Sequence, residues 1–239
     1  MLLVDEFTNY YDSSIGIKTI LLLRKLGYQV IIAPIKESAR TQISKGLLHK
    51  AKVVVNHNLQ HLKGKIDQEM PLVGIEPSAI LTFRDEYPDL ASDELRATAQ
   101  EIAKHTFTIE EFLAAEMKEG KIRTTSFTKE PKTISFHAHC YQKSLSNTYL
   151  IKRVLSFPQN YVAKEIRSGC CGMAGGFGYE DKHYDLSMKI GEMVLFPAVR
   201  QTSASTLLLT SGHSCRHPIT DGTQRDAVHP VEVLFEAFL

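Results

Sequence analysis

The sequence predicts an α/β protein made of two duplicated α/β halves, with mainly parallel strands and flanking helices. Short apolar runs alternate with segments of helical spacing along all 239 residues. The same order of elements then recurs in the second half of the chain. A hydrophobic fraction of 43% and a charged fraction of 23% are ordinary for a globular protein with a sizeable core.

In the first half, short apolar runs predict strands at residues 2–4, 30–33 and 71–75. Apolar residues at helical spacing predict helices at residues 15–26, ended by Gly27, and at 46–62. Residues 76–78 are expected to form a turn. A long helix is expected from the N-cap candidate Ser92 to Gly120, either continuous or broken near residues 105–107.

In the second half, the same criteria predict strands at residues 134–136, 161–166 and 206–210. They predict helices at residues 146–155, 184–200 and 231–239. Strands and helices that alternate at these lengths favour a parallel sheet in each half.

We therefore expect two domains, a cysteine-free half at residues 1–125 and a cysteine-bearing half at residues 126–239. When the halves are laid on one another, Thr8 falls opposite Cys140, Ser38 opposite the adjacent Cys170 and Cys171, and Ala79 opposite Cys215. This alignment indicates an internal duplication in which only the second copy kept cysteines. The first half is expected to bind no metal through thiolates.

Charge and hydropathy exclude several classes of partner. A formal net charge of +1 gives no reason to expect nucleic acid. No apolar stretch approaches the ~20 residues of a membrane span, and no secretory signal is recognisable. We expect a cytoplasmic chain that reaches the inner membrane only through partners, and the abrupt start in a strand suggests a piece of something longer.

The four cysteines are the candidate chemistry. Cys140 and Cys215 each lie just after a predicted strand, and the pair Cys170-Cys171 precedes a glycine-rich run at residues 172–178. Loops that follow parallel strands meet at one edge of a sheet, so four thiolates can converge there. In a reducing compartment such a group binds metal more often than it cross-links. Four thiolates are the usual ligands of an iron–sulfur cluster, and among cluster types we expect [4Fe–4S]. Four thiolates are also a usual ligand set for structural zinc, so zinc is the alternative.

Histidines are the competing ligands. His137 and His139 precede Cys140, while His213 and His217 flank Cys215. They are expected either to ligate metal or to hydrogen-bond the sulfur ligands from outside.

Three stretches together are similar to a known family: residues 137–143 (HAHCYQK), 170–175 (CCGMAG) and 214–217 (SCRH). They resemble the cysteine-rich CCG domain found in heterodisulfide reductase and in the iron–sulfur subunit of glycolate oxidase. Residues 74–78, 83–87 and 177–189 look most like the C-terminal region of FAD-linked D-lactate and D-2-hydroxyglutarate dehydrogenase-type oxidases. The resemblance covers nearly the whole chain.

This resemblance implies an iron–sulfur electron-transfer module of a FAD-linked 2-hydroxy-acid oxidoreductase, not catalytic alone. It implies ligation by Cys140, Cys170, Cys171 and Cys215. FAD would sit in a missing portion or in a partner, so the expected partners are a flavin-containing dehydrogenase domain or subunit and a downstream electron acceptor. Two departures matter: Glu37-Ser38-Ala39 replaces a first CCG motif, and Arg216-His217 follows Cys215 where some members have a further cysteine.

Two other functions stay open. A zinc-bound or metal-free domain could dock onto a flavoprotein without transferring electrons, since zinc has no second accessible oxidation state. Direct thiol or disulfide chemistry, by analogy with heterodisulfide reductase, rests on fold alone.

Overall fold

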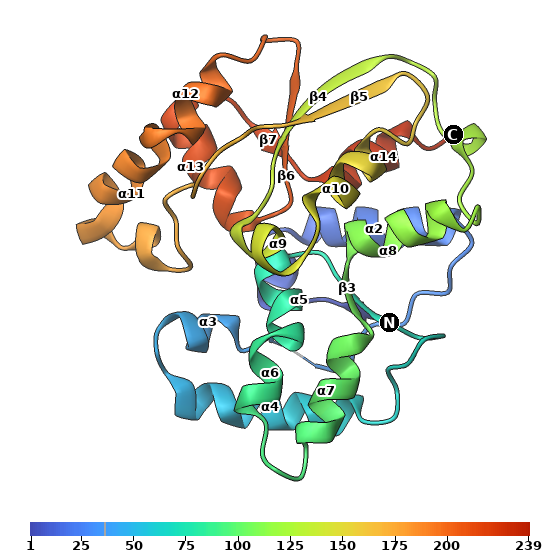
Figure 1. The fold of residues 1–239 in the computed structure, drawn as a ribbon, viewed down its shortest axis with the longest axis vertical. Helices are drawn as coiled ribbons and strands as arrows, with labels where there is room; N and C mark the ends of the chain where they lie inside the picture. The colour runs from blue at the N-terminus through green and yellow to red at the C-terminus, as the bar shows by residue number, and fades with distance from the viewer. Residues whose placement is uncertain (36) are drawn as a thin grey trace. The chain divides into compact units, whose positions relative to one another are not determined.

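The computed structural model describes residues 1–35 and 37–239 and confirms the α/β class (Figure 1). It contains two parallel sheets, each flanked by helices. The chain divides into two units, Met1–Phe112 and Leu113–Leu239. The boundary falls within helix α8 (Ile109–Lys118).

The first unit has a three-stranded parallel sheet in the order β1-β2-β3, formed by Leu2–Leu3, Leu72–Gly74 and Thr106–Thr108. Burial of Leu2, Leu3 and Leu72 makes this sheet part of the core. Its helices are α1 (Glu6–Tyr10), α2 (Ser13–Lys25), α3 (Arg40–Ser44), α4 (Leu48–Leu62), α5 (Pro77–Arg84), α6 (Glu86–Leu90) and α7 (Arg96–Lys104). Helices α4, α6 and α7 pack together (Figure 1).

Three expectations for the first unit need comment. The predicted strand at 30–33 is wrong, because the pairing of these described residues is limited to a single bridge between Ile32 and Leu2. The predicted turn at 76–78 is also wrong, because Glu76 caps α5 by accepting a hydrogen bond from Ser78 N, with Pro77 in the first turn. The predicted long helix does break near residues 105–107, and the break contains β3.

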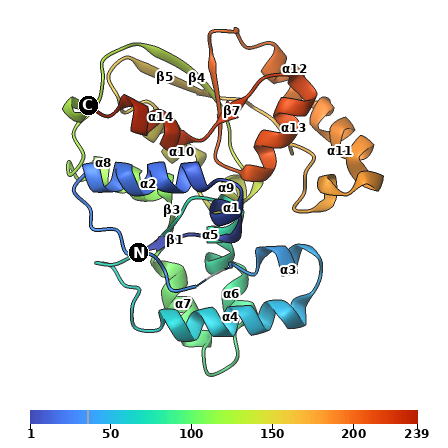
Figure 2. The ribbon, with the colours of Figure 1, turned by 180° about the vertical axis from the view of Figure 1, so that it is seen from behind.

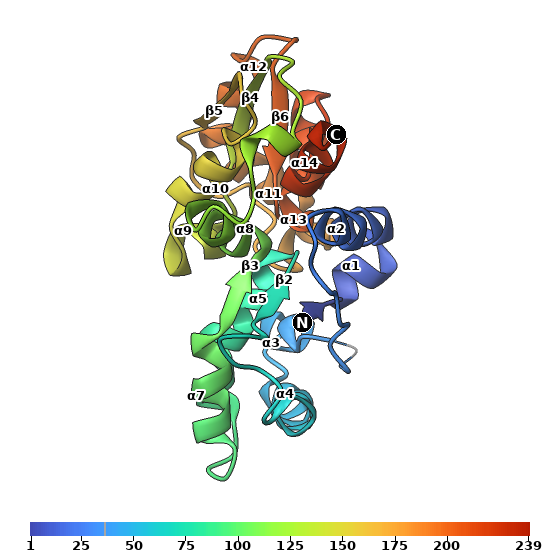
Figure 3. The same cartoon turned by 90° about the vertical axis from the view of Figure 1, so that its right-hand side faces the viewer.

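The second unit has a four-stranded parallel sheet in the order β5-β4-β6-β7. Its strands are β4 (Lys132–His137), β5 (Tyr161–Glu165), β6 (Leu207–Thr210) and β7 (Ala227–Val228). The helices are α9 (Cys140–Leu145), α10 (Thr148–Leu155), α11 (Asp181–Met193), α12 (Leu195–Arg200), α13 (His213–Thr223) and α14 (Pro230–Ala237). Figures 1 and 2 show α10 on one face of this sheet and α14 on the other, and Figure 3 gives the edge-on view.

This topology sets the place of the cysteines. Strand β4 leads into α9, β5 into the cysteine loop and β6 into α13, so all three connections leave the same edge of one parallel sheet. Helices α9 and α13 were not predicted. The predicted helix at 184–200 is two helices, α11 and α12, separated at Val194, whose φ of −145° is not helical.

Candidate metal centre

Cys140 is the first residue of α9, directly after β4. The helix begins there because His139 Nδ1 accepts the Tyr141 backbone N–H at 3.2 Å, while Gln142 Oε1 accepts the His139 N–H at 3.1 Å. This reciprocal cap fixes the direction of the chain at Cys140. The thiol-bearing residue is exposed.

The Cys170-Cys171 pair lies in the loop that follows β5. Gly172 has a φ of +98°, and a Cβ at this position would collide with the Ser187 carbonyl, so only glycine fits. The Gly172 N–H points back to Cys170 Sγ at 3.3 Å. The tight turn leaves Cys171 buried and Cys170 half-buried.

Lys143 fastens the start of this loop to α9. Its ammonium group donates hydrogen bonds to the carbonyl oxygens of Ser168 at 2.8 Å and Gly169 at 3.3 Å. The helix that presents Cys140 is thereby tied to the segment that presents Cys170.

Cys215 lies in the first turn of α13 and is buried. Gly212 precedes the helix, and a Cβ there would lie 3.3 Å from Cys215 Sγ and still closer to the His139 ring. Arg216 holds the same turn by donating to the Ser211 carbonyl at 3.1 Å. The thiol therefore faces inward from a closely packed turn.

The four thiols form a series in which each affects the pKa of the next, from Cys140 to Cys170, from Cys170 to Cys171 and from Cys171 to Cys215. Hydrogen bonding to Cys170, with burial, raises the pKa of Cys140. Hydrogen bonds from Cys140 and Cys171 lower the pKa of Cys170. Cys171 has its pKa raised by Cys170 and Cys215, while its own thiol lowers the pKa of Cys215.

His137, the last residue of β4, joins this group. It is buried, and one of its ring nitrogens lies within 4.8 Å of the sulfurs of both Cys171 and Cys215. Its Nδ1 lies 2.7 Å from Ser168 Oγ.

The other three predicted histidines have different surroundings. His139 uses Nδ1 as a helix cap. The rings of His213 and His217 contact one another at 4.7 Å, and exposed His217 also meets Tyr179. Among the described residues, the donor group within 4.8 Å includes only His137 of the four histidines.

The sequence analysis did not predict that Ser168 and Lys143 take part in the site. Lys143 stands three residues after Cys140, so its position on the same helix face was a usable signal. Ser168 gave no comparable signal, because its contact with His137 depends on how β4 and β5 pair in space.

In the first unit, hydroxyl groups occupy two of the positions aligned with the cysteines, Thr8 and Ser38, and Ala79 occupies the third. Thr8 donates to Asp5 at 2.8 Å, and the Ser38 hydroxyl donates to Glu6 at 2.9 Å. Burial raises the pKa of Asp5 to about 7. These hydrogen bonds between buried polar side chains account for Thr8 and Ser38 without a metal.

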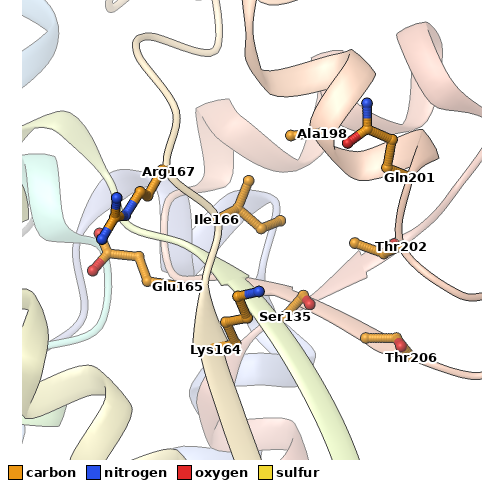
Figure 4. A pocket seen from close by; sticks show the side chains of 9 residues that line it. All are labelled: Ser135, Lys164, Glu165, Ile166, Arg167, Ala198, Gln201, Thr202 and Thr206. Atoms are coloured by element: carbon orange, nitrogen blue, oxygen red, sulfur yellow. The ribbon is translucent and has the colours of Figure 1, made fainter.

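A pocket of about 700 Å³ lies beside β5 and α12 (Figure 4). Ile166, in its wall, belongs to the same apolar cluster as Cys171 and Cys215. The lining of the pocket is Ser135, Lys164, Glu165, Ile166, Arg167, Ala198, Gln201, Thr202 and Thr206. Since these described residues include neither cysteine nor histidine, the pocket is separate from the sulfur group.

The donor set fits a thiolate-bound metal. The buried Cys171 and Cys215 come from two different loops, and their sulfurs lie with a buried imidazole nitrogen of His137 within 4.8 Å of one another, whereas Cys140 and Cys170 lie outside this close group of described residues. Buried thiolates without a cation are costly, and metals that prefer sulfur remove that cost.

No family model matches the chain. The chain is similar to D-2-hydroxyglutarate dehydrogenase of Escherichia coli strain K12, with 28% identity over 233 residues, 97% of this chain and 22% of that protein. The Pseudomonas putida protein of the same name is 26% identical over 99% of the chain and 22% of its own length. One subunit of the anaerobic glycerol-3-phosphate dehydrogenase of Escherichia coli strain K12 is 24% identical over 97% of the chain and 57% of its own length. Nearly the whole chain is therefore similar to one part of larger dehydrogenase proteins.

Proposed function

We propose that the chain is the iron–sulfur electron-transfer module of a FAD-linked 2-hydroxy-acid oxidoreductase. The observation that carries the proposal is that the connections bearing Cys140, Cys170, Cys171 and Cys215 leave one edge of a parallel sheet, where the sulfurs of Cys171 and Cys215 lie close together. These four cysteines would hold a [4Fe–4S] cluster, which matches the usual complement of thiolates. Similarity to dehydrogenases along nearly the whole chain supports the same function.

When bound, such a cluster accepts and passes on single electrons. The residues of this chain would hold it and control its surroundings. Cys171 and Cys215 are buried and shield the inner side from water, whereas exposed Cys140 and half-buried Cys170 lie on the outer side. That outer side is the edge that a partner's redox group can approach.

The proposed partners are a flavin-containing dehydrogenase domain or subunit and a downstream electron acceptor. FAD and the 2-hydroxy acid would bind outside this chain. In the described ranges, no helix combines the length and apolarity needed to cross a bilayer. We propose a cytoplasmic location, with any approach to the inner membrane made through partners.

A second candidate is a zinc-bound docking module. The ligand atoms of His137, Cys171 and Cys215 lie within 4.8 Å of one another, which is near the maximum separation of about 4.6 Å for two donors that each bind one zinc ion at ~2.0–2.3 Å. This close group favours a single ion, which would stabilise the second unit without transferring electrons.

Anaerobic purification with iron, sulfide and zinc analysis separates the two candidates. Iron and sulfide near four per chain, with visible absorbance that bleaches on dithionite, are expected for the electron-transfer module. Cys171→Ser should lose that absorbance. Ala174→Ser, which adds a hydroxyl to an exposed position of the same loop, should keep it. Stoichiometric zinc without visible absorbance would reject the electron-transfer function in favour of docking.

A further inference from the structure

We infer that Nε2 of His137 is a direct ligand of the metal centre beside Cys171 and Cys215, in place of one of the two outer thiolates of the proposed four, so that the centre has a mixed imidazole and thiolate donor set. The inference rests on the proposed function in one respect, that Cys171 and Cys215 hold a metal here.

The hydrogen bonds of Ser168 fix the tautomer of His137. The Ser168 hydroxyl donates its proton to the Ile166 carbonyl at 3.2 Å, because a carbonyl oxygen can only accept. The same Ser168 Oγ lies 2.7 Å from His137 Nδ1, and with its own proton directed to Ile166 it accepts the Nδ1 proton. A neutral imidazole with its proton on Nδ1 presents a lone pair at Nε2. This is the form in which histidine binds metals.

Nε2 is buried at the end of β4, and within the described ranges it has no hydrogen-bond partner of acceptable geometry. Leaving a buried nitrogen unsatisfied costs about 1–3 kcal/mol. With Nδ1 engaged by Ser168, Nε2 is the nitrogen left to face Cys171 and Cys215. A cation between these three atoms satisfies all of them at once.

The alternative is that His137 donates a hydrogen bond to a sulfur ligand from outside the centre. That requires a proton on Nε2, and with Nδ1 already donating to Ser168 the ring would then be a cation. The ring helps to lower the pKa of Cys215, through its contact with the sulfur and through charge, after the larger effects of Cys171 and His139. Its orientation nevertheless gives Nε2 no hydrogen bond of acceptable geometry with the described residues. With direct ligation, Nδ1 donates to Ser168 and Nε2 binds the metal, so both ring nitrogens have a partner.

Ligation by a neutral imidazole also has a chemical consequence. Each imidazole that replaces a thiolate removes one negative charge from an iron–sulfur centre and raises its reduction potential, as in clusters with histidine ligands. His137 would therefore make this centre a better electron acceptor than an all-thiolate one.

The test uses the full chain, loaded with metal under anaerobic conditions and produced with either ¹⁴N- or ¹⁵N-histidine. If iron is bound, pulsed electron paramagnetic resonance of the dithionite-reduced protein should show a strongly coupled nitrogen whose frequency changes with the isotope. If zinc is bound, X-ray absorption at the zinc edge should show imidazole scattering. Either signal should disappear in His137→Gln and persist in His217→Gln, a histidine beside Cys215 that lies outside the donor group.

The wild-type spectra decide the matter even if His137→Gln does not fold. Bound iron or zinc without a ligating nitrogen would overturn the inference and leave metal binding intact. Zinc with a ligating nitrogen would support His137 while rejecting the electron-transfer function. Absence of any metal after reconstitution would reject both.

Discussion

The ammonium group of Lys143 donates a hydrogen bond of 2.8 Å to the carbonyl oxygen of Ser168. One side chain thus joins the helix that begins at Cys140 to the loop that carries Cys170. It also places a positive charge beside the sulfurs.

Lys143→Met should therefore weaken the centre in two ways. Loss of a hydrogen bond to a metal ligand typically lowers metal affinity 10–100-fold; Lys143 orients the cysteine loop through backbone carbonyls, so release to a chelator should be about tenfold faster, at the low end of this range. Loss of the positive charge should lower the reduction potential of a bound cluster, because a cation favours the reduced, more negative state. Lys143→Arg should retain most of both properties. Lys164→Met, on an exposed site of β5, serves as the control for charge alone.

Gly172→Ala should destabilise the second unit by about 2 kcal/mol or more, because φ at +98° is strained for alanine and its Cβ would strike the Ser187 carbonyl. Gly169→Ala is the matched control, since a Cβ there meets nothing within 4 Å. Urea denaturation followed by far-ultraviolet circular dichroism compares the two. Equal midpoints would contradict the steric argument.

In the metal-free protein, iodoacetamide should modify Cys170 first. Its pKa is lowered by hydrogen bonds from Cys140 and Cys171, and it is half-buried, so a thiolate is within reach of the reagent. Exposed Cys140 should follow, because its raised pKa keeps it a thiol, and buried Cys171 and Cys215 should be slowest. Peptide mass spectrometry over time gives the order. Metal loading should slow modification at all four, and equal rates with and without metal would argue against their ligation.

Asp5 should make the stability of the first unit depend on pH. Burial raises the pKa of Asp5 to about 7. The hydrogen bond from the Thr8 N–H lowers this pKa, and the negative charge of Glu76 raises it further. Between about pH 4 and 7 the folded state therefore binds a proton that the unfolded state has released, so the contribution of Asp5 to stability is greatest below pH 4 and falls as the pH rises through 7. The full loss is at most about 4 kcal/mol.

The variant Asp5→Asn isolates this effect. Its urea midpoint should change less between pH 4 and 8 than that of the wild type. Asp67→Asn is the matched control, because exposed Asp67 also accepts two backbone N–H groups, from Glu69 and Met70. If Asp5→Asn and the wild type lose stability in parallel over this range, the carboxyl does not titrate as described.

Strands β1, β2, β4, β5 and β6 were predictable from short apolar runs, and the edge at which the cysteine loops leave the sheet was predictable from the rule for parallel sheets. Strands β3 and β7, which are only three and two residues long, were not predicted. Helix α9 was not, because its cap is made by His139 and Gln142, whereas the familiar capping pattern begins with serine or threonine. Helix α13 was hidden by the internal Pro218, which ordinarily ends a helix.

The strand expected at residues 30–33 failed for a different reason. Apolar character at Ile31 and Ile32 does not specify a pairing partner, and these described residues form a single bridge, to Leu2. The contact between Ser168 and His137 was equally out of reach, since it depends on the register of β4 and β5.

The three connections that leave β4, β5 and β6 are far apart in the sequence, yet they end on one group of sulfurs. A metal held there would act as a removable cross-link within residues 113–239. Because binding to the folded form alone adds to stability by mass action, the second unit would melt at a temperature set by metal supply. The first unit, whose aligned positions carry no thiol, would keep its melting temperature when a chelator is added.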